Sequence, residues 1–209
     1  VDVAHGAHER DPLSHDVSAA PVPAAKRAGL VVDVPGVDLP PSIHRALRRA
    51  ADVLQQSGWD IVEMTLPDLD DVHHCWHQIV ALEQQQQVAQ SKALLRHPTH
   101  AFLQRMIAAA GDLSVGLDVM RTQRAHHMQT WSKLFQATPV VLAPSYTTSG
   151  WAPDADLDDE HGVQLLRDTA RTLTPANVLG LPALALPIHD DVHGDETKAP
   201  VGIQLMAER

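Results

Sequence analysis

Histidines at helical spacing are the first residues whose types could do chemistry. His73 and His77 lie four residues apart in the stretch HHCWH, so a helix would place both imidazoles on one face, a spacing that can hold Zn²⁺. Cys75 would point elsewhere on that helix, Asp70 could add one oxygen, and no His-Glu-x-x-His pattern is present. We therefore interpret the two histidines as surface or interface residues.

Two further polar stretches lack the spacing of a cation site. His126 and His127 are adjacent, and neighbouring residues face different directions on a helix. The acidic run 154–160 lacks the ligand spacing of an EF-hand, so we interpret it as a solvated loop. We predict no metal site in this chain.

The sequence also lacks a recognisable hydrolase nucleophile. It contains no Gly-x-Ser-x-Gly and no two adjacent glycines, and Ser149-Gly150 has no preceding glycine with which to form an anion-binding nest. None of the lysines ends an apolar strand, where burial could lower its pKa. These lysines are Lys26, Lys92, Lys133 and Lys198. We predict that no catalytic residue lies in this chain.

Composition restricts the classes of partner and compartment. The 209 residues are 44% apolar and 20% charged, as in globular proteins. The net charge of −10 argues against binding to nucleic acid or to anionic membranes. No apolar run approaches the roughly 18 residues of a membrane span. A single cysteine, Cys75, excludes an intrachain disulfide and favours a reducing, cytoplasmic compartment.

The elements that must position a site begin with a strand–helix–strand unit. The run 28–34 is β-branched and apolar, and 59–67 alternates like a second strand. Between them, Pro41 opens a helix whose apolar residues recur every three or four positions, and Gly58 lies where a C-terminal cap belongs. Such a unit predicts parallel strands.

The rest of the chain adds helices and then late strands. We divide it into an irregular lead-in (1–27), the strand–helix–strand unit (28–67), a helical layer (68–137), and late strands with a long loop (138–209). Within the last part, 162–173 is predicted to be helical, and Ala183 to Leu186 suits a buried central strand. The pattern predicts an α/β fold with a mixed sheet.

The end of the chain resembles the amidase signature family, which are serine hydrolases of carboxylic amides. The resemblance lies in Asn177-x-x-Gly180-x-Pro182-Ala183-x-x-x-Pro187, followed by Pro200-x-Gly202-x-Gln204. Supporting stretches occur in the family's order, from RDPLS at residue 10 through the strand–helix–strand unit to TPVVLAPSYTTSGWAPD. Nearly all of residues 10 to 206 is covered, which implies the C-terminal part of the family's α/β/α fold, with a helical insertion.

The resemblance implies a catalytic apparatus that this chain does not contain. In the family a Ser-Ser-Lys arrangement lies in a Gly-Gly-Ser-Ser-Gly-Gly-like segment and an earlier Lys, both upstream of everything matched here. The chain does not begin with Met. We therefore expect the C-terminal portion of an amidase, inactive alone, whose parent needs no metal or organic cofactor.

The resemblance also implies which residues touch substrate. In the family, the helix before the motif Asn and the loop after the late strand line the acyl side of the pocket. Here those positions are Ala170, Thr174 and Asn177, at helical spacing, and Trp151 in the loop. The expected partner is a small-molecule amide, and homo-oligomerisation stays open.

Two alternatives to a simple amidase remain. One is the amidotransferase A-type subunit that amidates misacylated tRNA, which implies protein partners and tRNA; the acidic balance argues weakly against it. The other is a non-catalytic binding domain with the amidase fold, which predicts that this chain folds alone.

Overall fold

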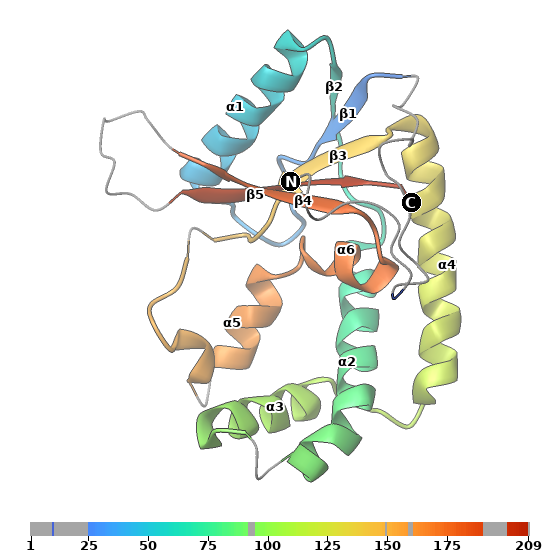
Figure 1. Ribbon diagram of the computed structural model, residues 1–209, viewed down its shortest axis with the longest axis vertical. Helices are drawn as coiled ribbons and strands as arrows, with labels where there is room; N and C mark the ends of the chain where they lie inside the picture. Colours follow the sequence, from blue (N-terminus) through green and yellow to red (C-terminus); the bar gives the residue numbers. More distant parts are fainter. Residues whose placement is uncertain are drawn as a thin grey trace.

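The computed structural model describes residues 25–91, 95–148, 150–158, 161–189 and 200–208, together with Arg10. These residues form a five-stranded mixed sheet with the strand order β2-β1-β3-β5-β4 (Figure 1). Its strands are β1 (Arg27–Leu30), β2 (Asp60–Glu63), β3 (Val140–Pro144), β4 (Ala183–Ile188) and β5 (Val201–Ala207). The predicted α/β class is confirmed.

The strand–helix–strand unit is parallel, as predicted. β1 pairs in parallel with both β2 and β3, and α1 (Pro41–Gln56) connects β1 to β2. Pro41 occupies the first helical position, where a missing N–H costs nothing, and Gly58 follows the helix end with φ 84. Both strands are shorter than the predicted runs 28–34 and 59–67.

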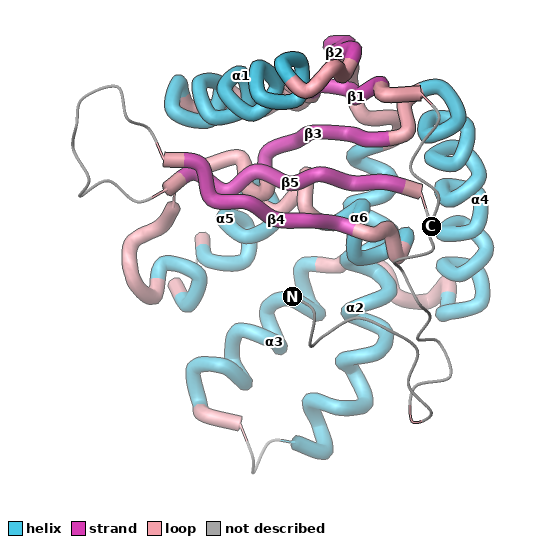
Figure 2. Tube along the Cα trace, turned by 45° about the horizontal axis from the view of Figure 1, so that its top comes forward, coloured by secondary structure: helices cyan, strands magenta, loops and turns pink. Residues whose placement is uncertain are grey.

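Strand β5 runs antiparallel to its neighbours and fixes what each face of the sheet presents. Leu142 on β3 lies opposite Leu205, and Ala143 lies opposite Gln204. Because side chains alternate along a strand, Leu142 and Leu205 share one face, while Gln204 and Gly202 share the other. Figure 2 shows α1 lying over one face and the remaining helices on the opposite side.

The helical layer packs beneath that second face. Its helices are α2 (Leu69–Ser91), α3 (His97–Ala109), α4 (Gly116–Ala137), α5 (Gly162–Thr169) and α6 (Thr174–Leu179). The short α6 packs against both α2 and α4, and Trp131 and Phe135 of α4 are buried in the core. None of the described helices combines the length and the apolarity that crossing a bilayer requires.

Two local predictions are wrong. The expected helix 162–173 stops at Thr169, and a turn separates α5 from α6, which begins at Thr174. Strand β4 is not a buried central strand in the described part of the chain: it pairs only with β5, and Leu184 is 55% exposed. The apolar pattern of β4 is typical of burial, and Leu186 and Ile188 pack against the core, but residues 183–185 are exposed.

Candidate binding pocket beside the end of strand β3

A pocket of about 320 Å³ lies beside the end of β3, where residues 145–148 leave the sheet. Its lining combines two aromatic residues with small ones: Tyr146, Thr148, Gly150, Trp151, Pro200 and Gly202. The rings of Tyr146 and Trp151 meet edge to face, with centroids 5.9 Å apart. A concave site with an aromatic wall suits a small ligand that carries a flat apolar group.

The pocket loop, defined here as residues 145–148, is held by the turn between α5 and α6. The Thr147 backbone N–H donates to the Thr169 carbonyl at 3.0 Å, and the Thr147 hydroxyl donates to the Asp168 carbonyl at 3.1 Å. The Thr172 hydroxyl donates to the Ser145 carbonyl at 3.3 Å. Three bonds therefore tie the loop to residues 168–172.

Gln204 ties the same turn to the sheet. Its side chain is only 1% exposed, and its Nε2 donates to the carbonyls of Thr172, at 2.6 Å, and Pro144, at 3.3 Å. Because a buried carbonyl without a donor is costly, one amide stabilises both the end of β3 and the α5–α6 turn.

Two hydroxyl groups at this place have no partner among the described residues. They are the buried Ser145 Oγ and Thr148 Oγ1. A Cβ added at Gly202 would lie 3.4 Å from Ser145 Oγ, so the absence of a side chain at Gly202 leaves space beside that hydroxyl. Buried polar groups are usually satisfied, so these hydroxyls suit hydrogen bonds to water or to a ligand.

The structure separates the four residues expected to contact substrate. Trp151 lines the pocket. Ala170, at the end of α5, and Thr174 are both buried, and the Thr174 backbone N–H donates to the Ala170 carbonyl at 3.1 Å. Asn177 is exposed on α6. Only Trp151 belongs to the described pocket lining.

Sequence reasoning missed most of the pocket. Tyr146 is the single tyrosine of the chain and lies five residues before Trp151, which is a signal that could have been used. Gly202 and Gln204 belong to the quoted C-terminal motif, yet nothing local in the motif reveals that they face the loop after β3. The described lining carries no carboxylate, lysine or histidine, so this pocket can bind a ligand but supplies no general base.

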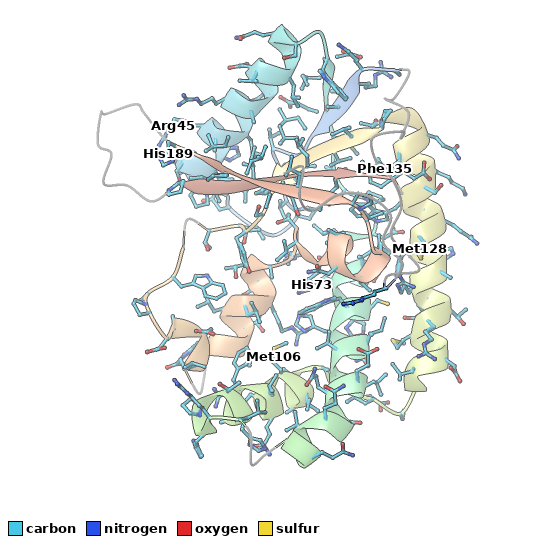
Figure 3. All side chains as sticks on the ribbon, in the orientation of Figure 1. Arg45, His73, Met106, Met128, Phe135 and His189 are labelled. Carbon is cyan, nitrogen blue, oxygen red and sulfur yellow. The ribbon has the colours of Figure 1, made fainter. Side chains whose placement is uncertain are left out.

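The paired histidines are buried, which corrects their interpretation as surface or interface residues. Figure 3 labels His73 on α2. His73 and His77 on α2 are 8% and 2% exposed. Their Nε2 atoms lie 3.2 Å apart, and His73 Nδ1 lies 3.1 Å from Thr174 Oγ1. No group of three metal-ligating side chains occurs in the described ranges.

Burial keeps both imidazoles neutral. It lowers the pKa of His73 from 6.5 to about 4; the positive charge of Arg167 on α5 adds to the effect, while a hydrogen bond to the Arg167 backbone opposes it. It also lowers the pKa of His77 from 6.5 to about 3, with His73 and then Arg167 as further causes. The exposed His74 adds a smaller repulsion to each.

Acid should therefore destabilise the protein through these histidines. Below pH 6.5 both histidines bind protons in the unfolded chain, whereas in the folded chain His73 binds a proton only near pH 4 and His77 only near pH 3. The stability that they contribute is therefore full above pH 6.5 and is lost as the pH falls through this window. Replacing His77 by Gln should reduce the loss of unfolding free energy between about pH 7 and about pH 4.5 by about 2 kcal/mol, measured by urea unfolding. His126→Gln, the same change at an exposed position, should leave the loss unchanged; an equal loss in the wild type and His77→Gln would contradict the prediction.

Comparison with known proteins places these features in a family. A family model described as Amidase matches residues 6–209. Indoleacetamide hydrolase from Bradyrhizobium japonicum is 30% identical over 218 residues, covering 100% of this chain and 45% of its own length. The A-type subunit of glutamyl-tRNA(Gln) amidotransferase from Synechococcus sp. (strain CC9311) is 25% identical, covering 94% of this chain and 46% of its own. The chain thus spans less than half of these curated relatives.

Solved structures share the fold at lower identity. A 6-aminohexanoate cyclic dimer hydrolase superimposes with a TM-score of 0.66 at 19% identity, covering 90% of this chain and 42% of that one. A bacterial aryl acylamidase of the amidase signature family superimposes with a TM-score of 0.58 at 20% identity, covering 88% of this chain and 40% of that one.

Proposed function

This chain belongs to the amidase family, and from that membership we propose that the protein carrying it hydrolyses a carboxylic amide with water to an acid and ammonia or an amine. The observation that carries the proposal is the family match over residues 6–209. The shared fold of amidase-signature enzymes is consistent with it.

We place the reacting groups of this hydrolysis outside the chain. The Ser-Ser-Lys chemistry that the resemblance implies requires a lysine base and a glycine-rich oxyanion loop. Of the four lysines, the described Lys26 and Lys133 are both exposed. The chain would then contribute part of the substrate pocket, and alone it would have no hydrolase activity.

The substrate class that the pocket favours is an amide with a flat aromatic acyl group. Tyr146 and Trp151 supply an aromatic wall, and the pocket volume of about 320 Å³ suits a two-ring group. The 30%-identical relative that is named for indoleacetamide supports the same class. In this proposal Trp151 contacts the acyl group, and the buried Ala170 and Thr174 support the pocket wall from behind. Asn177, which is exposed on α6, lies outside this pocket.

An amidotransferase A-type subunit is the second candidate, because relatives with that name are 25% identical to this chain. It would act with partner subunits on misacylated tRNA. The net charge of −10 gives this chain little electrostatic attraction for RNA. For the amidase we propose the cytoplasm as compartment and a small amide, not nucleic acid or a membrane, as partner.

Hydrolysis of model amides by the full-length protein tests the proposal. We expect kcat/KM for indole-3-acetamide to exceed that for acetamide by at least about tenfold, because only the aromatic amide can use the pocket wall. Ammonia release measures both reactions. Amidation of misacylated tRNA by a reconstituted complex would favour the amidotransferase instead. A protein inactive in both assays would favour a non-catalytic binding domain.

A further inference from the structure

A directed chain of hydrogen bonds runs from α2 to the turn between α5 and α6. The Thr174 hydroxyl donates its only proton to the Arg171 carbonyl, at 3.0 Å. Its oxygen must then accept from His73 Nδ1, 3.1 Å away, so the proton of the neutral His73 lies on Nδ1. Because His73 Nε2 is consequently bare, it accepts from His77 Nε2–H at 3.2 Å. His73 also has a hydrogen bond to the backbone of Arg167 on α5, which adds a second link between α2 and α5.

These hydrogen bonds keep their donor-to-acceptor direction because both imidazole rings are neutral. A proton added to His73 Nε2 would face the N–H of His77, and two donors cannot bond to each other. Burial disfavours that proton, as the lowered pKa values of both rings indicate. Arg167 of α5 is a further positive group near the pair, and the nearby Arg171 is paired with Asp70 of α2.

The far end of this series of hydrogen bonds reaches the pocket loop. Arg171, whose carbonyl accepts from Thr174, immediately precedes Thr172, and Thr172 bonds to the Ser145 carbonyl. The same turn follows Thr169, which accepts the Thr147 N–H. The position of the turn therefore determines the position of the pocket loop.

We propose that His77 and His73 are positioning residues that hold the pocket loop 145–148 in place through Thr174 and the α5–α6 turn. Their relevance to substrate rests on the proposed function, because it assigns the pocket to the acyl group of the amide. Their role in holding the loop does not rest on the proposed function, because it is argued from the hydrogen bonds alone. Neither histidine belongs to the described pocket lining, so both act through Thr174 and through the hydrogen bond of His73 to the Arg167 backbone of α5.

Hydrogen–deuterium exchange in the full-length protein tests this role without an activity assay. Thr174→Val keeps the side-chain shape and removes the hydroxyl, and His77→Phe keeps a ring and removes the donor. In both variants we expect the Thr147 amide to exchange at least about tenfold faster, because its bond to Thr169 depends on the held turn. Thr174→Ser and His77→Gln retain a hydroxyl and a donor, and they should restore most of the protection.

The Val31 amide, which donates to the Leu142 carbonyl within the sheet, is the internal reference. Faster exchange at Thr147 with unchanged exchange at Val31 would support the positioning role. Unchanged exchange at Thr147, an equal increase at both amides, or failure of Thr174→Ser to restore protection would overturn it. This measurement involves no substrate hydrolysis, so a negative result would count against the positioning role and not against the proposed function.

Discussion

Replacing Trp151 by alanine should raise KM for indole-3-acetamide by roughly 10- to 100-fold in the full-length protein, while acetamide hydrolysis changes little. Trp151 forms one aromatic wall of the pocket, edge to face with Tyr146. Losing about 100 Å² of apolar contact at about 25 cal/mol per Å² removes about 2.5 kcal/mol of binding, which corresponds to this range. Steady-state kinetics on the two amides measure the effect.

Two further variants make the Trp151 result decisive. Trp151→Phe keeps an aromatic face and should retain most of the affinity. Gly202→Ala adds a methyl group, which meets Ser145 at an ordinary contact distance of 3.4 Å, so the fold should tolerate it while the pocket narrows. A rise in KM that is equal for both amides in Trp151→Ala would place the aromatic group elsewhere.

Replacing Gln204 by methionine should lower the free energy of unfolding by about 2–4 kcal/mol, because two buried carbonyls lose their donor while the side-chain volume is kept. The donor serves Thr172 and Pro144 from a side chain that is 1% exposed. Urea unfolding followed by circular dichroism measures the change.

The same substitution at an exposed glutamine is the control for Gln204. Gln104→Met on α3 should change the unfolding free energy by less than about 0.5 kcal/mol. If Gln204→Met is as mild as Gln104→Met, then the two carbonyls find other donors and Gln204 does not hold the α5–α6 turn against the sheet.

The sequence by itself determined the elements whose signals are local. Pro41 and Gly58 mark the ends of α1 because proline fits a first helical turn and glycine fits a positive φ. Gly180 ends α6 in the same way, with φ 67. Strand, helix, strand spacing predicts the parallel pairing of β1 and β2, because a crossover of that length cannot form a hairpin. The ordered motif at the chain end was enough to indicate the family.

Only the tertiary structure decided which residues meet. His73 bonds to Thr174 across 101 positions, and Gln204 bonds to Thr172 across 32. Nothing in the helical spacing of His73 and His77 distinguishes a surface pair from a buried one, because burial depends on α6 covering α2. Gly202 enters the pocket because its place on β5 puts it on the same face as Gln204, opposite α1. Periodicity describes one element at a time, whereas the pocket and its support arise from pairing and packing between elements that are distant in the chain.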